Sequence, residues 1–472
     1  MKMLLSKLYK IRFLVIFLLI SSEAFAGVSL AINAEEIPRT KILFLGFDEI
    51  KTTPDMTQNR VAEINERNLI IERIKKNLKT TDLFEIVANK TPNPQDLQGH
   101  APSASTKGIN LAKNAANVES LPDFNKYNKD GIGAIIIGYF DYDQAGDLEL
   151  RLRMWDVLDE RQLFGKYYTA SKDNYRKMAN AISDEIFKAI TGEKAGYFNA
   201  KIIYVSEGGP ANKRLKKISM IDFDGENYRA LTTSRDLVLT PIFSKKSDEI
   251  IFVRYFENHP QIFTLNLNNL RTQRLGGFNI TNFAPSTHPR NSNNVLLSAI
   301  SDGNSDIYEL DIAADSAVKL TNNPAIDTTP SYSPDGKLIA FTSDRVNQQQ
   351  QIYLMDTNGS SVRKVSQGEG SYSKPMWSPD GKMLAFTRIK GGQFFIGIME
   401  IEGAREKLLT SGYLVEGARW SSGGRHLIFS KKKGKFGAGS IPRLYIIDVV
   451  TGFEYEIPTP EGEGAIDPDW VM

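Results

Sequence analysis

The sequence predicts an α/β N-terminal domain followed by a larger all-β domain built from repeats. The clearest evidence for the repeats is a phrase that occurs twice, as SYSPDGKLIAFTSDR at 331–345 and as MWSPDGKMLAFTR at 376–388. Its central aromatic or leucine residue recurs about every 45 residues, a period that is typical of repeat architectures. The six recurring positions are Tyr204, Phe252, Leu297, Phe341, Phe386 and Phe429.

Each repeat has room for four short strands. In the copy around Phe341, an extended segment ends at Ser-Pro-Asp-Gly, and the apolar strand LIAFTS, a third strand at 351–356 and a fourth at 362–367 follow it. Asp-Gly and Asn-Gly supply the positive φ angles that hairpin turns require. Four strands in about 45 residues are the signature of a propeller blade. The third strand recurs six times, as KISMIDFDG, QIFTLNLNN, DIYELDIAA, QIYLMDTNG, FIGIMEIEG and RLYIIDVVTG, and predicts an all-β six-bladed β-propeller over residues 196–472.

The two ends of this region are expected to complete one blade together. The chain ends in GAIDPDWVM, a first strand that no second strand follows, whereas IIYV at 202–205 is a second strand without a first. We therefore expect Asp467–Val471 to pair beside Ile202–Val205. Such a ring closure removes the exposed edges that an open sheet must protect.

The N-terminal domain, residues 27–195, mixes strands and helices. One helix is expected after Thr53-Pro54-Asp55, and a second is expected to be capped by Asp173 and stopped by Gly192. Their inward faces consist of Val61, Ile64, Ile71, Ile74 and Leu78 in the first, and of Tyr175, Met178, Ile182 and Ile186 in the second. Strands are expected at 41–47, 84–87 and 133–140, followed by a hairpin of DLELRLRMWDV and QLFGKYYTAS. Residues 89–118, rich in Asn, Pro, Ser and Gly, are expected to form a flexible loop.

Residues 1–26 have the pattern of a secretory signal peptide. A basic leader precedes the apolar run Phe13–Ile20, and Ala24-Phe25-Ala26 is a small-residue site that predicts cleavage after Ala26. An uncleaved anchor is the alternative, although eight apolar residues are far fewer than the roughly 20 of a spanning helix. We expect no transmembrane segment in the mature chain. The formal net charge is +2 for the whole chain and −1 without the leader. A charge this close to zero does not indicate a nucleic-acid-binding protein.

No catalytic or metal-binding constellation is visible in the sequence. The four histidines, at 100, 259, 288 and 426, lack metal-ligand spacing, and there is no cysteine. Asp335 and Asp380 are interpreted as turn residues rather than catalytic carboxylates. We therefore expect no enzymatic activity, no metal and no cofactor. The basic run at 431–435 is open to two interpretations, a solvated loop or a seat for an acidic partner.

The order of signal peptide, α/β domain and six blades resembles the TolB family of the bacterial Tol-Pal system. Beyond the blade motif, the segments LPDFNKYNKDGIGAIIIG (121–138) and SDEIFKAITGEKAGYFNAKIIYV (183–205) carry this resemblance. It implies a periplasmic adaptor that binds the lipoprotein Pal through the propeller and the inner-membrane-anchored TolA through the mature N-terminus. It also implies a role in outer-membrane integrity and in constriction at cell division. Other outer-membrane proteins are further candidate partners. Blades three and six lack Pro-Asp-Gly, and the loop at 89–118 is longer than the family needs.

The resemblance and the order of the strands together predict two binding regions. The segment Gly27, Val28, Ser29, Leu30, Ala31, Ile32 and Asn33 alternates in polarity and is expected to add as a strand to TolA, or to pair within its own domain. The propeller has a turn face, which carries the Ser-Pro-Asp-Gly turns, and an opposite crossover face, where the chain passes between blades. Because the crossovers vary in sequence, we expect Pal to bind the crossover face; irregular loops are the alternative. The residues expected to form the Pal site are Leu239, Thr281, Asn282, Ala284, Thr328, Thr329, Ser373, Lys374, Glu416 and Asp467.

Two other classes of function are compatible with a propeller. One is a carrier that binds a small ligand or a glycan in the central channel. The other is a peptidase whose propeller gates a catalytic domain, which would need a Ser-His-Asp set that this sequence lacks.

Overall fold

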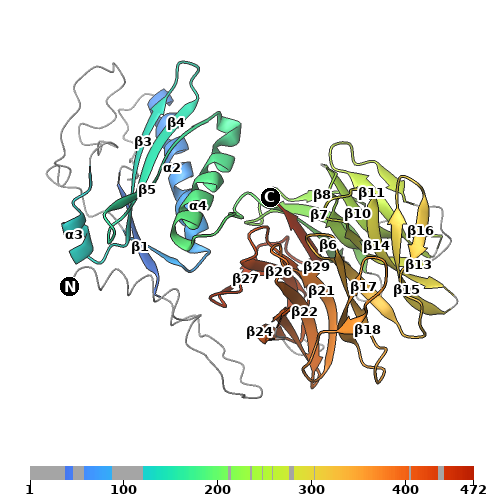
Figure 1. Ribbon diagram of the computed structural model, residues 1–472. Coiled ribbons are helices and arrows are strands. Elements are labelled where there is room, and N and C mark those ends of the chain that lie inside the picture. The colour runs from blue at the N-terminus through green and yellow to red at the C-terminus, as the bar shows by residue number, and fades with distance from the viewer. Residues whose placement is uncertain are drawn as a thin grey trace, which may run out of the picture. The chain divides into compact units, whose positions relative to one another are not determined.

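The computed structural model divides into two compact units between Gly192 and Glu193 (Figure 1). None of the helices among the described residues is long and apolar enough to cross a membrane. The structure describes residues 38–45, 58–87, 121–210, 214–233, 237–246, 248–257, 259–275, 281–301, 303–402, 405–433 and 441–472. The predicted signal peptide, the TolA segment, the helix start at 53–55 and the loop at 89–118 lie outside these ranges.

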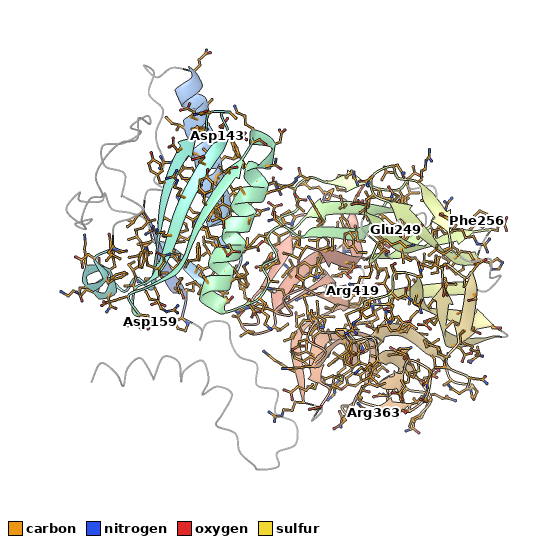
Figure 2. All side chains as sticks on the ribbon, turned by 45° about the horizontal axis from the view of Figure 1, so that its top comes forward. Asp143, Asp159, Glu249, Phe256, Arg363 and Arg419 are labelled. Carbon is orange, nitrogen blue, oxygen red and sulfur yellow. The ribbon has the colours of Figure 1, made fainter. Side chains whose placement is uncertain are left out.

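The N-terminal unit contains a five-stranded mixed sheet in the order β2-β1-β3-β4-β5. Strands β2, β1 and β3 are parallel, whereas β3, β4 and β5 run antiparallel to one another. The two links of this antiparallel part lie at opposite ends of the sheet, where Figure 2 labels Asp143 and Asp159. The strands are β1 (Thr40–Leu45), β2 (Phe84–Val87), β3 (Ala134–Tyr142), β4 (Leu148–Asp156) and β5 (Arg161–Ala170).

Two long helices, α2 (Gln58–Lys79) and α4 (Tyr175–Thr191), pack against each other beside this sheet. The four inward residues predicted for α4 are all buried, and Gly192 ends the helix with a φ of 74° while its N–H bonds to the carbonyl of Lys188. The predicted cap at Asp173 is wrong. A 3-10 turn, Lys172–Asn174, precedes the helix, so Asp173 lies inside that turn and Asn174 takes the cap position. The short helix α3 (Phe124–Lys129), capped by Asp123, was not predicted.

The second unit is a six-bladed propeller, as predicted, with four strands in each blade. Blade 1 comprises β29 (Gly464–Val471), β6 (Lys201–Gly208), β7 (Leu215–Asp222) and β8 (Arg229–Ala230); blade 2 comprises β9 (Val238–Phe243), β10 (Glu249–Phe256), β11 (His259–Asn266) and β12 (Thr272–Arg274); blade 3 comprises β13 (Thr281–Thr287), β14 (Asn294–Ser301), β15 (Asn304–Asp311) and β16 (Ser316–Lys319); blade 4 comprises β17 (Asp327–Tyr332), β18 (Leu338–Ser343), β19 (Gln351–Asp356) and β20 (Arg363–Lys364); blade 5 comprises β21 (Ser371–Trp377), β22 (Met383–Lys390), β23 (Gln393–Glu400) and β24 (Glu406–Gly412); and blade 6 comprises β25 (Leu414–Trp420), β26 (His426–Lys432), β27 (Arg443–Asp448) and β28 (Glu454–Ile457).

The ring closes through the two ends of this unit. The last strand, β29, pairs antiparallel with β6, and Trp470 stands opposite Ile202 in the register. Indole nitrogens reinforce the inner ring: the Nε1–H groups of Trp377, Trp420 and Trp470 donate to backbone carbonyls of the preceding blade at 3.1, 3.0 and 2.8 Å. The predicted closure is therefore confirmed.

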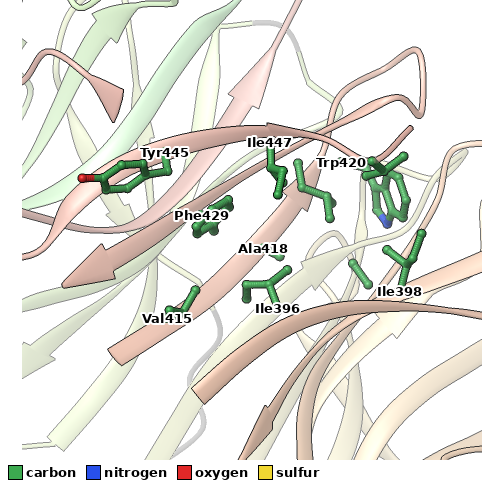
Figure 3. Packing of buried hydrophobic residues seen from close by; sticks show 11 residues of the cluster. Ile396, Ile398, Val415, Ala418, Trp420, Phe429, Tyr445 and Ile447 are labelled. Carbon is green, nitrogen blue, oxygen red and sulfur yellow. The ribbon is translucent and has the colours of Figure 1, made fainter. Parts of the chain in front are cut away.

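The hydrophobic core of the propeller lies between neighbouring blades. Figure 3 shows one such cluster, in which Ile396 and Ile398 of blade 5 pack against Val415, Phe429 and other residues of blade 6. All six recurring aromatic or leucine positions are buried, at most 3% exposed. The recurring residue of the repeated phrase is thus a core residue in each blade. It recurs because each blade must bury the same faces against its neighbours.

Candidate functional site

The inner strands share a backbone feature that forms a frame around the central channel. In each of the six blades the pairing of the first and second strands shifts register once, at a β-bulge. At each bulge one residue has a left-handed backbone, which is uncommon outside glycine and unusual for β-branched threonine. These six residues are Thr240, Ala284, Thr329, Lys374, Gly417 and Asp467, with φ angles between 43° and 74°.

The residue that follows each left-handed residue also lines the channel. It is a proline in five blades, and it is Ala418 in blade 6. These residues and the six left-handed residues line a cavity of about 70 Å³ inside the ring. The wall is therefore stiff and largely apolar, because a proline ring fixes its own φ and offers no N–H donor.

Bonds between blades help to hold the left-handed residues in place. The backbone N–H of Thr329 donates to the hydroxyl of Ser298 at 3.0 Å, and that of Lys374 donates to the hydroxyl of Thr342 at 3.2 Å. In both cases the acceptor lies on the second strand of the preceding blade. A conformation that is costly in isolation persists here because the neighbouring blade fixes it.

The charged residues of the cavity come from blades 5, 6 and 1. The ammonium group of Lys374 lies 2.7 Å from Glu416 and 3.9 Å from Asp467. Burial alone would lower the pKa of Lys374, but the two carboxylates outweigh it and raise that pKa. Burial raises the pKa of Asp469, which accepts a hydrogen bond from the N–H of Phe243 at 2.8 Å. The corresponding left-handed residues of blades 2, 3 and 4 are Thr240, Ala284 and Thr329, so the charge is confined to one half of the ring.

Most residues of the predicted Pal site lie at this frame. Ala284, Thr329, Lys374 and Asp467 line the cavity. Leu239, Thr328, Ser373 and Glu416 directly precede a left-handed residue. Thr281 and Asn282 are the first two residues of β13, and their side chains lie outside the described part of the structure.

Sequence reasoning missed the bulges, the proline wall and Arg419, a further charged residue that lines the cavity. The crossovers end in LTP, FAP, TTP, SKP, EGA and IDP, so the proline at the third position of five of them was an available signal. It was hidden because the residue before the proline is threonine in two blades and alanine, lysine or aspartate in the other three.

The carboxylates of the repeated turns serve the turns themselves. The hydroxyl of Ser333 donates to Asp335 at 2.6 Å, and that of Ser378 donates to Asp380 at the same distance. The Ser333 hydroxyl, which is the main cause, lowers the pKa of Asp335. Gly336 and Gly381 have φ angles of 71° and 72°, as the Asp-Gly turn requires. The interpretation of both carboxylates as turn residues fits this geometry.

Two of the histidines take part in turn or core structure. In blade 3, which lacks Pro-Asp-Gly, His288 replaces the turn serine, and its Nδ1 accepts from the N–H groups of Arg290 and Asn291. His426 is buried at the start of β26. Within the described residues, no cluster of three or more His, Asp or Glu side chains could hold a metal ion. In the basic run, Lys431 and Lys433 bond to Glu454 and Glu456 of their own blade.

The fold and this frame define a six-bladed β-propeller preceded by an α/β domain. A family model described as PD40, TolB beta propeller domain, matches residues 187–472. The chain is 40% identical over 353 residues to the Tol-Pal system protein TolB of Gluconobacter oxydans (strain 621H), covering 74% of this chain and 77% of that relative. It is 41% identical over 166 residues to the Tol-Pal system protein TolB of Paramagnetospirillum magneticum (strain ATCC 700264 / AMB-1), covering 35% and 37% of the two chains. This chain therefore belongs to the TolB family of Tol-Pal system proteins.

A solved structure supports the same fold. The crystal structure of TolB from Acinetobacter baumannii matches with a TM-score of 0.72 and 23% identity, covering 92% of this chain and 96% of that one.

Proposed function

We propose that this Tol-Pal system protein is a periplasmic adaptor without enzymatic activity. In this proposal the crossover face of the propeller binds the lipoprotein Pal, and residues 27–33 bind TolA. The adaptor would couple the inner and outer membranes, and would support outer-membrane integrity and constriction at cell division. Membership of the TolB family supports the proposal.

The observation that carries the Pal site is the contrast between backbone and side chains at the bulges. All six bulges place a left-handed residue at the same point of the inner strand, yet these six residues belong to five types. The shared backbone belongs to the architecture of the ring, because every blade repeats it. Side chains that vary on a rigid frame are typical of a recognition surface.

The size of the channel cavity favours an adaptor over a carrier of small ligands. A drug-sized ligand or a sugar occupies a pocket of about 300–1,000 Å³. The cavity here measures about 70 Å³, enough for a few water molecules. A partner that covers the mouth of the channel from outside avoids this limit, whereas a glycan inside the channel does not.

Direct binding measurements test the proposal. Purified protein lacking the signal peptide should bind delipidated Pal and, separately, TolA without its membrane anchor in isothermal titration calorimetry. A second protein that also lacks residues 27–33 should keep Pal binding and lose TolA binding. Failure of the longer protein to bind Pal would reject the Pal assignment, and undiminished TolA binding by the shorter one would reject the TolA segment.

A further inference from the structure

One of the six inner strands lacks the restraints that stiffen the rest of the channel frame. Blades 1 to 5 each combine a left-handed residue that has a side chain with a proline directly after it. In blade 6 these two positions are Gly417 and Ala418. Glycine adopts a φ of 74° without strain and can leave it as easily, and alanine does not fix its own φ as a proline ring does. The bulge of blade 6 therefore has the least restricted backbone in the ring.

The hydroxyl contact from the preceding blade is missing at this bulge as well. Blades 4 and 5 hold their left-handed residues through Ser298 and Thr342, and Thr387 occupies the equivalent position for blade 6. Thr387 is only 3% exposed, yet within the described residues its hydroxyl has no hydrogen-bond partner. In the described part of the ring, blades 1, 2 and 3 also lack this contact, but each keeps its proline. Blade 6 is thus the one blade with neither restraint.

Both ends of this inner strand are held, so its freedom is confined to the middle. Val415 is fully buried, and the Nε1–H of Trp420 donates to the carbonyl of Met376 in blade 5 at 3.0 Å. Figure 3 shows Ala418 between these two side chains, where it contributes only a methyl group to the packed cluster. We call residues 416–418 the adjustable segment.

The adjustable segment carries the carboxylate that lies closest to Lys374. The ammonium group of Lys374 lies 2.7 Å from Glu416, and the backbone of Lys374 is fixed by Pro375 and by its bond to Thr342. The second carboxylate, Asp467, lies 3.9 Å away on a strand that has its proline. A local shift of blade 6 therefore separates Glu416 from Lys374 and leaves Asp467 in place.

We propose that the adjustable segment opens locally while the five proline-containing inner strands keep their positions. Local opening breaks few contacts, so it requires less free energy than unfolding of the whole propeller. Each opening separates the pair of Glu416 and Lys374, and the charged half of the channel mouth changes without a change in the rest of the ring. This inference goes beyond the proposed function and does not depend on a partner.

Amide hydrogen exchange of the purified protein tests the proposal. The amides of β25, which contains the adjustable segment, should exchange as a group at least about fivefold faster than those of β9 and β13. Val205 and Val253 occupy the hydroxyl position for these two strands, so β9 and β13 differ from β25 mainly in having a proline after the left-handed residue. Equal exchange of the three strands, after correction for intrinsic rates, overturns the proposal.

Two reciprocal substitutions assign the cause. Ala418→Pro gives blade 6 the residue that the other five blades have, and it should slow the exchange of β25 about fivefold. Pro285→Ala gives blade 3 the residue of blade 6, and it should speed the exchange of β13 by a similar factor. Each strand is the control for the variant of the other. If Ala418→Pro lowers the thermal midpoint, Pro285→Ala decides, and unchanged exchange of β13 in that variant contradicts the role of the proline.

Discussion

Tyr197 lies over His426, with the two ring centroids 4.2 Å apart. Tyr197 belongs to the segment that follows Gly192, and both residues are almost fully buried. Next to this pair, Arg425 lies 2.8 Å from Asp448 and 3.6 Å from Glu193. The segment that enters the propeller is thus packed onto the turn of blade 6 through one tilted ring pair and one charged cluster.

This packing predicts a loss of stability in acid. Burial lowers the pKa of His426 from 6.5 to about 4, so the folded protein resists protonation of this ring while the unfolded chain accepts it. The contribution of His426 should therefore be constant above about pH 7 and should fall as the pH decreases from about 6.5 to about 4. The difference amounts to roughly 3 kcal/mol of unfolding free energy. Urea unfolding at a series of pH values measures it.

The variant His426→Gln isolates this contribution. It removes the titrating ring, whereas the neighbouring carboxyl groups of Asp448 and Glu193 remain. The difference in unfolding free energy between the two proteins should change with pH between 6.5 and 4. A difference that is independent of pH would contradict the assignment.

Removing the last strand should open the ring. Deletion of residues 464–472 leaves the edge of β6 unpaired and removes the Trp470 bond to the carbonyl of Trp420. We expect the propeller to lose its cooperative thermal transition or to aggregate, because an exposed inner edge strand pairs with other chains. Deletion of Met472 alone is the control, and it should leave the transition intact. Scanning calorimetry and light scattering record both.

A bulky charge beside a bulge should block Pal. Thr328 directly precedes the left-handed Thr329, whose hydroxyl lies 2.8 Å from that of Thr342. Thr328→Arg therefore leaves this hydroxyl contact in place, and it should weaken Pal binding at least about tenfold by steric and charge mismatch. Lys337→Glu and Lys382→Glu on the turn face should have no effect. If only the turn-face variants lost binding, Pal would bind the turn face and not the crossover face.

The left-handed frame predicts different outcomes for two alanine-to-glycine substitutions. Ala284 has a φ of 54°, a conformation that costs an L-residue about 1–2 kcal/mol but costs glycine almost nothing. Ala284→Gly should therefore keep or raise the free energy of unfolding. Ala299 is buried in β14 and has no positive φ. Ala299→Gly should therefore lower the free energy of unfolding by about 1 kcal/mol or more. Chemical denaturation measures the free energy of unfolding of both variants. An equal decrease in the two would contradict the backbone strain at Ala284.

The sequence predicted the features that every blade must repeat. A blade cannot pack unless Phe341 and its counterparts are apolar, and the Asp-Gly turns at Gly336 and Gly381 need a residue that tolerates a positive φ. Both requirements constrain residue type strongly, so they are visible without a structure. The pairing of β29 with β6 could be predicted because each was a strand without its partner.

The candidate site was less predictable because its regularity lies in the backbone. Thr329, Lys374 and Asp467 share a conformation that none of these residue types favours, so only the neighbouring blades specify it. The proline that follows them is also common in ordinary loops, which made it an ambiguous signal. Asp173 failed for a related reason: a 3-10 turn displaced the cap by one residue, and propensity does not resolve such a shift.

The closing strand also sets the order of events during synthesis. Ser206 on β6 hydrogen-bonds to Glu463, 257 residues further along the chain and directly before β29. Blade 1 is therefore begun first and finished last, and β6 has no inner neighbour until the C-terminus has emerged. A ring that only its last strand can complete stays open until that strand has been made, so the closure of the whole propeller depends on one late, long-range pairing.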